Sequence, residues 1–488
     1  MLRKLRILLQ VVTITLVTLL LLGIGFQVHL WAGWVAKIQF FPAILALSFG
    51  VLALLIAATL IFGRLYCSVV CPLGIMQDIF SWIGGKIKKN RFYYAKEKLW
   101  LRMVCLVVFI IAMIIGFAPV TTLIEPYSAY SRIVNSLFKP LYDMLNNWLA
   151  SIDAANDRYN FTEVQIWMRS VTTFVVAIAT LVILGALAMW KGRLYCNTVC
   201  PVGTLLSLCS RYPLLRVRFD KDKCKNCGMC EKNCKAQAID FKEGKVDYAR
   251  CVVCGDCLAK CKFDALHYTA KKPTSQPKPV DTERRAFLVG AAVAGTTAAL
   301  AQTQMKVDGG LAVIEDKTAP KRKTPITPPG SVSARNMQKH CTACQLCVSS
   351  CPNNVLRPST DMMHFMQPTM SFERGYCRPE CTRCSEVCPT GAIKLITREE
   401  KTMQHIGHAV WIKDNCVVLT DGVSCGNCER HCPTGAITMV DYEGPNGTVQ
   451  VPAVDENKCI GCGACENLCP ARPFSAIYVE GNVSHHIG

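Results

Sequence analysis

Sixteen cysteines between Cys341 and Cys469 constrain this chain more than any other feature of its sequence. They fall into four groups of four. The first and last groups have the spacing C-x2-C-x2-C-x3-C-P; the second opens with x3, the third opens with x8, and both end like the others. The groups are Cys341, Cys344, Cys347, Cys351; Cys377, Cys381, Cys384, Cys388; Cys416, Cys425, Cys428, Cys432; and Cys459, Cys462, Cys465, Cys469.

This spacing is typical of bacterial [4Fe–4S] sites, in which three successive cysteines ligate one cluster and the fourth ligates its neighbour. A zinc site closes with paired ligands and does not use a triplet with a distant fourth. Disulfide frameworks are typical of small secreted domains, not of a 488-residue chain with long apolar segments. The array therefore predicts four clusters.

Two pairings of these groups are compatible with the sequence. If neighbouring groups pair, Cys388 joins the first three cysteines of the first group, and Cys351 joins those of the second. In the same way, Cys469 joins the first three cysteines of the third group, and Cys432 joins those of the fourth. In a nested pairing, the first group pairs with the fourth and the second with the third. The sequence does not decide between them.

Two further groups precede the array and bring the predicted number of [4Fe–4S] clusters to six. They are Cys224, Cys227, Cys230, Cys234 and Cys251, Cys254, Cys257, Cys261. The crossover rule assigns Cys261 to the first cluster and Cys234 to the second. Lys235 and Lys262 stand where a proline usually follows the fourth cysteine. Short apolar stretches at 238–241 and 265–268 predict one strand after each group.

Four apolar runs, 7–28, 40–62, 101–120 and 166–190, are each long enough to cross a bilayer. Lys and Arg are concentrated at the N-terminus, in 63–98 and after residue 190, which predicts that these segments are cytoplasmic. The net charge is +19, and much of it lies in these membrane-flanking segments, so we do not expect a nucleic-acid partner. The predicted fold is a four-span α-helical membrane domain (1–218) followed by small α+β domains of the bacterial ferredoxin type.

An internal repeat follows the second and fourth runs. Gly63-Arg-Leu-Tyr-Cys-x3-Cys-Pro-x-Gly recurs from Gly192, so that two C-x3-C-P motifs are formed by Cys67, Cys71, Cys196 and Cys200. If the halves pack together, the four thiols meet at the cytoplasmic face. They could ligate a metal, cycle between thiol and disulfide, or only shape a helix break at the proline. The isolated Cys105 and Cys209 are expected to be core packing residues.

The remaining segments divide the chain further. A cytoplasmic two-cluster domain is predicted at 219–270, a linker at 271–335, and a four-cluster domain at 336–480. Within the linker, Arg284 and Arg285 precede a Gly/Ala/Thr-rich stretch that ends at 301, a pattern typical of twin-arginine export of folded proteins. Residues 302–335 are expected to be a flexible tether. The four-cluster domain should therefore be periplasmic, and the whole protein a multi-pass protein of the cytoplasmic membrane.

Other cofactors are not expected. No C-x-x-C-H motif occurs, and before residue 260 the sole histidine is His29, so haem is not predicted. Asp421-Gly-Val-Ser lacks the continuation of a flavin-attachment motif, and 290–295 lacks the spacing of a nicotinamide site. His29 and Glu125 are candidate proton acceptors near the outer face, although a plain surface role fits each.

At this point the chain resembles two families joined end to end. Residues 1–270 are similar to NapH-type membrane ferredoxins, and residues 282–480 to NapG/MauM-type exported polyferredoxins. The resemblance implies a quinol dehydrogenase component that takes electrons from the membrane quinone pool and feeds a periplasmic reductase, of the nitrate-reductase type, or a cytochrome. Two alternatives stay open: a transmembrane conduit from a cytoplasmic donor, and an accessory protein for maturation of a periplasmic metalloenzyme. No catalytic residue is assigned.

Overall fold

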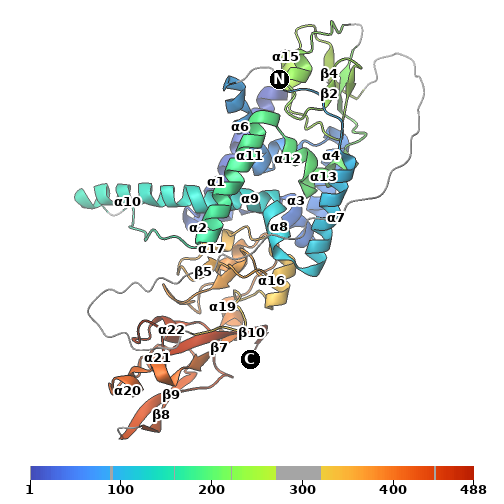
Figure 1. Cartoon of the computed structure of the whole chain (residues 1–488). Helices are drawn as coiled ribbons and strands as arrows, with labels where there is room; N and C mark the ends of the chain where they lie inside the picture. The colour runs from blue at the N-terminus through green and yellow to red at the C-terminus, as the bar shows by residue number, and fades with distance from the viewer. Residues whose placement is uncertain are drawn as a thin grey trace.

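The computed structural model describes residues 2–87, 92–158, 160–220, 223–270, 320–444 and 447–487. Within these ranges the chain forms a bundle of helices with one small cysteine-rich unit at each end (Figure 1). We call residues 216–270 the inner unit and residues 320–487 the outer unit. The proposed export segment with Arg284 and Arg285 lies outside the described residues.

Four apolar helices form the length of the bundle: α1 (Leu2–Leu22), α4 (Phe49–Phe62), α7 (Leu99–Ile115) and α11 (Val171–Lys191). Shorter helices connect and brace them: α2 (Gly25–Lys37), α3 (Phe40–Leu45), α5 (Tyr66–Val69), α6 (Pro72–Ile87), α8 (Ala118–Ile124), α9 (Pro126–Ile133), the π-helix η1 (Val134–Phe138), α10 (Lys139–Ala155), α12 (Leu194–Thr198) and α13 (Pro201–Cys209). Helix α10 projects sideways from the bundle near its outer end (Figure 1).

The outward surface of the bundle is apolar. The four long helices expose large aliphatic and aromatic side chains that no other described residue covers. Those more than half exposed include Leu8, Val11, Leu54, Ile114, Ile115, Val171, Val182 and Trp190. Contiguous apolar surface on this scale is rare on soluble monomers and marks a surface that binds protein or membrane.

Among the described helices, α1 and α11 are long and apolar enough to cross a membrane, at 21 residues each. The predicted second run is instead divided into α3 and α4, and α4 has 14 residues, or about 21 Å at 1.5 Å per residue. Helix α7 has 17 residues. Two of the four predicted spans are therefore helices of sufficient length, and the four-span domain stays a prediction.

The inner unit is built from two-stranded pieces and single-turn helices, as expected for a small α+β domain. Strand β1 (Arg216–Phe219) pairs antiparallel with β4 (Leu266–Thr269), and β2 (Ile239–Asp240) with β3 (Lys245–Val246). Helices α14 (Met229–Lys232) and α15 (Asp256–Lys260) follow the two cysteine loops. Strands β2 and β4 lie where the sequence predicted them.

The outer unit repeats this plan on a larger scale. Its antiparallel pairs are β5 (Leu356–Pro358) with β6 (Pro368–Met370), β7 (Gln404–Trp411) with β10 (Ile477–Ile487), and β8 (Ile437–Gly444) with β9 (Gly447–Val454). Its helices are α16 (Ala334–His340), α17 (Leu346–Ser350), α18 (Arg383–Val387), α19 (Arg398–Thr402), the 3-10 helix η2 (Lys413–Asn415), α20 (Val417–Thr420), α21 (Asn427–Arg430) and α22 (Ala464–Asn467).

Two sequence boundaries of this unit are corrected. The prediction of a flexible tether up to residue 335 is wrong from residue 320 onward. There the backbone N–H groups of Lys323 and Thr324 donate to the Glu480 carboxylate, and Ile326 is 1% exposed. The unit also extends past residue 480 to the end of β10. The basic, proline-rich composition of this segment suggested a linker, but its backbone is held by a strand more than 150 residues later.

The two units contact opposite ends of α1, and each also contacts the end of another long helix. At one end of α1, Arg3 Nε lies 3.0 Å from Asp256 Oδ1 of the inner unit. At the other end, Gly23 lies against the backbone of Ser349 in the outer unit. Helix α7 likewise ends at Gly116 against Gln338, and Arg193, just after α11, donates its N–H to Lys235 O.

Candidate functional site

Four small pockets in the two units are each lined by four cysteines from two different groups. Three successive cysteines of one group are joined by the last cysteine of its neighbour in every case. The sets are Cys251, Cys254, Cys257 with Cys234; Cys377, Cys381, Cys384 with Cys351; Cys416, Cys425, Cys428 with Cys469; and Cys459, Cys462, Cys465 with Cys432. The outer groups therefore pair with their neighbours in sequence, and the nested alternative does not occur.

The first outer group is completed in the same manner. Cys388 acts electrostatically on Cys341, Cys344 and Cys347, so it lies beside all three. In the inner unit, Cys230 is likewise close to Cys224 and Cys227.

In five of the six groups, the sulfur of the last cysteine accepts a backbone hydrogen bond. A backbone N–H a few residues later donates to its sulfur, at 3.2–3.5 Å. The pairs are Ala238 to Cys234, Ala265 to Cys261, Ile393 to Cys388, Ala436 to Cys432 and Ala476 to Cys469. Such hydrogen bonds tune the reduction potential of an iron–sulfur cluster.

These sites suit a multi-iron cluster better than a single ion. Among the described residues, no three Cys, His, Asp or Glu side chains converge closely enough to hold one metal ion. A cubane spreads its four thiolates over four iron atoms, which requires wider spacing. Burial raises the pKa of Cys344 to about 12 and that of Cys254 to about 12, so iron must displace a proton at each.

The four thiols of the two C-x3-C-P motifs are also brought together, at the centre of the bundle. Cys67, Cys71, Cys196 and Cys200 are each at most 6% exposed and act electrostatically on one another. We call them the four-thiol group. Cys200 caps α13 and its sulfur accepts the Gly203 N–H at 3.3 Å.

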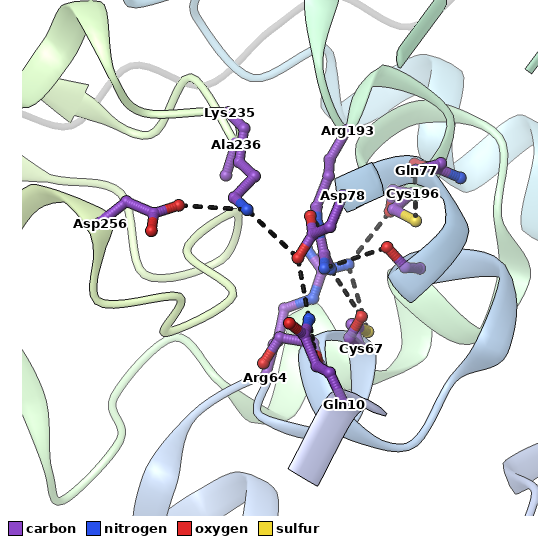
Figure 2. Close-up of polar contacts among 12 residues, drawn as sticks. Gln10, Arg64, Cys67, Gln77, Asp78, Arg193, Cys196, Lys235, Ala236 and Asp256 are labelled. Carbon is purple, nitrogen blue, oxygen red and sulfur yellow. Dashed lines mark hydrogen bonds and ion pairs between the residues drawn. The ribbon is translucent and has the colours of Figure 1, made fainter. Parts of the chain in front are cut away.

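The internal repeat explains the fixed residues of the motif. Arg193 Nη1 donates to Cys67 O at 2.6 Å, and Arg64 Nη2 donates to Cys196 O at 3.1 Å, so each half's arginine binds the other half (Figure 2). A Cβ at Gly74 would lie 2.3 Å from Cys67 O, a clash with backbone. The equivalent Gly203 is similarly close to Cys196 O, so both glycines permit the tight turn.

An ionic chain joins the four-thiol group to the inner unit (Figure 2). Lys235 Nζ lies 3.1 Å from Asp256 Oδ2 and 3.2 Å from Asp78 Oδ2. Asp78 Oδ1 in turn accepts from Arg193 Nε at 2.8 Å. Burial alone would raise the pKa of Asp78, but Arg193 and Lys235 outweigh it and hold that pKa below its usual value. Lys235 is the residue that replaced the expected proline.

On its other side the four-thiol group approaches the outer unit. Glu125, which is 1% exposed and caps α9, acts electrostatically on Cys71 and on Cys344 of the outer unit. Ser128 Oγ donates to Thr342 O at 2.5 Å. The plain surface role considered for Glu125 is therefore wrong, whereas His29 is only partly buried.

A large pocket of about 830 Å³ lies at the outer end of the bundle. It is bounded by η1, the first half of α10, residues 162–170, the start of α11 and the loops 345–358 of the outer unit. Cys351, the last cysteine of the first outer group, which completes the site of the second, is one of its lining residues. Sequence reasoning missed this pocket, because its walls come from segments that are far apart in the chain.

Comparison with known families agrees with this geometry. A family profile described as a 4Fe-4S binding domain matches residues 43–90 and 172–221. These ranges contain the two C-x3-C-P motifs. A profile described as a 4Fe-4S dicluster domain matches residues 223–278, 340–392 and 423–472. The chain therefore carries several ferredoxin-type 4Fe–4S domains.

Similar proteins are ferredoxin-type as well. Methylamine utilization ferredoxin-type protein MauM of Methylobacillus flagellatus is 32% identical over 31% of this chain and 66% of its own length. MauN of Paracoccus denitrificans is 27% identical over 42% of this chain and 57% of its own length. Ferredoxin-type protein NapF of Escherichia coli is 29% identical over 17% of this chain and 49% of its own length.

The chain thus covers less than two thirds of each of these relatives, and no solved structure matches it. Together the profiles and relatives identify a polyferredoxin.

Proposed function

We propose that this polyferredoxin is embedded in the cytoplasmic membrane, oxidises quinol, and passes the electrons to a reductase or cytochrome in the periplasm. One observation carries the proposal. An iron–sulfur unit lies at each end of a helical bundle whose outward surface is apolar (Figure 1). The 21 residues of α1 span about 31 Å, close to the thickness of a bilayer core.

The orientation is supported by the placement of charge. Arg3, Lys4 and Arg6 belong to the end of α1 that contacts the inner unit. Positive residues flank cytoplasmic ends of spanning helices, so the inner unit is cytoplasmic and the outer unit periplasmic. Export of a folded outer unit through the twin-arginine route is part of the same proposal.

The clusters supply the redox chemistry, since each exchanges one electron at a potential set by its surroundings. The protein positions them in a series. A lipid-soluble donor suits a bundle whose outward surface is apolar and which has a pocket beside Cys351.

The test is reduction of the purified, oxidised protein under anaerobic conditions by decylubiquinol or by menadiol. Cluster bleaching and EPR report how many clusters are reduced. We expect rapid reduction of at least two clusters. Reduction by dithionite but not by either quinol would reject quinol oxidation.

A second candidate function is a transmembrane conduit from a cytoplasmic donor to the periplasm. The four-thiol group favours it, because it lies between the inner unit, through Lys235 and Asp78, and the outer unit, through Glu125. A metal or cluster centre there would divide a long electron transfer into two shorter steps. Reduction of outer clusters by a reduced low-potential ferredoxin, in protein that quinol does not reduce, would select this function.

A further inference from the structure

The pocket at the outer end of the bundle has the features of a headgroup site. We propose that it binds the quinol ring, an inference that rests on the proposed function and assigns its substrate site. The pocket holds about 830 Å³, which is within the range of small-molecule sites. It lies where the apolar helices meet the outer unit, so a lipid-soluble molecule reaches iron–sulfur loops there without leaving the membrane surface.

Buried polar atoms without partners line this pocket. Within the described part of the chain, neither Nδ2 nor Oδ1 of Asn135 has a hydrogen-bond partner, and the same holds for Oγ1 of Thr173 and Nε2 of Gln345. Thr173 and Gln345 are only 3% and 4% exposed. Leaving such groups unpaired costs about 1–3 kcal/mol each. A ligand with two oxygens on opposite sides of a ring would satisfy them.

The wall that carries Asn135 is a π-helix, η1. Single π-turns inside α-helices occur mostly at functional sites, because the extra residue turns a side chain out of the regular helical ladder. Here the turn separates α9 from α10 and directs the chain from the bundle into the laterally projecting helix (Figure 1). The local irregularity and the unpaired amide therefore coincide at the pocket.

Charged groups at the pocket can take up protons. Lys139 Nζ lies 3.4 Å from Asp143 Oδ1 and also donates to Leu22 O at 3.0 Å. Arg169, another lining residue, interacts electrostatically with both Asp143 and Cys351. Among the described residues that line the pocket, Asp143 is the carboxylate available to receive a proton from a quinol hydroxyl.

The isoprenoid tail has an exit on the same side. Leu141 and Met144 line the pocket and are 61% and 55% exposed. On α10 they begin a stripe that continues through Leu145, Trp148 and Ile152, each more than 40% exposed. An amphipathic helix with one apolar face lies in the membrane interface. The headgroup would occupy the pocket while the tail passes this stripe into lipid.

The electron count matches the surroundings. Oxidation of one quinol to quinone breaks two O–H bonds and releases two protons and two electrons. The pocket adjoins two cluster sites: Gln345 lies in the loop of the first outer group, and Cys351, the last cysteine of that group, joins the three cysteines of the second. Two one-electron acceptors of the iron–sulfur class are therefore adjacent to a two-electron donor. The protons leave through Asp143 and water to the periplasmic side.

The test compares the holoprotein with two near-isosteric variants, Asn135→Leu and Thr173→Val. Decylubiquinone is titrated into each in detergent, and its binding is followed by calorimetry and by quenching of tryptophan fluorescence, to which Trp167 in the pocket wall contributes. We expect each variant to bind the quinone about fivefold more weakly, the loss of one hydrogen bond. The matched control is Thr180→Val on the same helix, whose hydroxyl donates to Val176 O away from the pocket.

A second readout separates binding from folding. Removing an unpaired buried polar atom does not destabilise a fold. The thermal midpoints of Asn135→Leu and Thr173→Val without quinone should therefore equal or exceed that of the wild type. A fall in midpoint together with weak binding would assign these residues a structural role and overturn the site.

The remaining outcomes distinguish this inference from the proposed function. If quinol reduces the wild-type clusters and both variants bind and react like the wild type, the pocket assignment is wrong and quinol oxidation stands. If the wild type neither binds decylubiquinone nor is reduced by quinol, the proposed function is rejected and the site with it.

Discussion

At the level of single residues, the carboxylate of Asp78 has partners on several elements. It pairs with Arg193 and Lys235 and accepts a hydrogen bond from Gln10 (Figure 2). It also pairs with Arg6, and thereby connects α1, the repeat and the inner unit. A buried carboxylate among three cations is stabilising only while all partners are present. The same residue thus fixes how the inner unit sits on the bundle.

Replacing Asp78 with Asn should destabilise the protein by about 3 kcal/mol, because three buried cations lose their counter-charge. Thermal unfolding in detergent, followed by loss of cluster absorbance, measures the change. Asp441→Asn, at an exposed position on β8, is the matched control. Equal midpoints for the two variants would contradict the structural role assigned to Asp78.

At the scale of elements, the repeated C-x3-C-P segments form the centre of the bundle. The sequence revealed the repeat and the convergence of its thiols. It did not reveal that Arg64 and Arg193 each donate hydrogen bonds to the other half of the repeat, because those contacts depend on the packing of α6 against α11. The thiols lie just after α4 and α11, between the inner unit and Glu125, which itself approaches the outer unit. Their predicted place at the cytoplasmic face stays a prediction.

The double variant Cys71→Ser/Cys200→Ser tests whether the four-thiol group holds a centre. We expect less iron per chain than in the control Cys105→Ser, together with slower electron exchange between inner and outer clusters. The reason is that serine is a poorer ligand than thiolate for iron. Unchanged iron content and an unchanged rate of electron exchange would contradict a metal centre at the four-thiol group.

Cluster loops were the most predictable elements. Their spacing assigned Cys234 to the site of Cys251, Cys254 and Cys257, which the structure confirms, and Cys261 to the other inner site, which stays a prediction. The spacing did not decide between neighbouring and nested pairing in the outer unit. That choice depends on which strands pair, and here β7 joins β10 around the third and fourth groups. The pocket was beyond sequence reasoning, because Asn135, Thr173 and Gln345 meet only after the bundle and the outer unit have docked.

At the scale of the whole molecule, the arrangement is two iron–sulfur units separated by an apolar bundle. A phosphatase reporter fused after residue 270 should be inactive, and one fused after the C-terminus should be active, because only the outer unit is expected to be exported. A fluorescent-protein fusion at each point should give the reciprocal pattern. An active phosphatase at residue 270 would reverse the orientation proposed for the inner unit.

In the proposed function, electrons pass from membrane quinol through this chain to the periplasmic side. The most direct measurement uses sealed vesicles that contain the holoprotein with its outer unit facing outward, decylubiquinol in the membrane and an impermeant one-electron acceptor outside. We expect reduction of two acceptor molecules per quinol, at a rate that Asn135→Leu lowers and Thr180→Val does not. No acceptor reduction in vesicles whose clusters are reduced by quinol would contradict delivery to the periplasmic side.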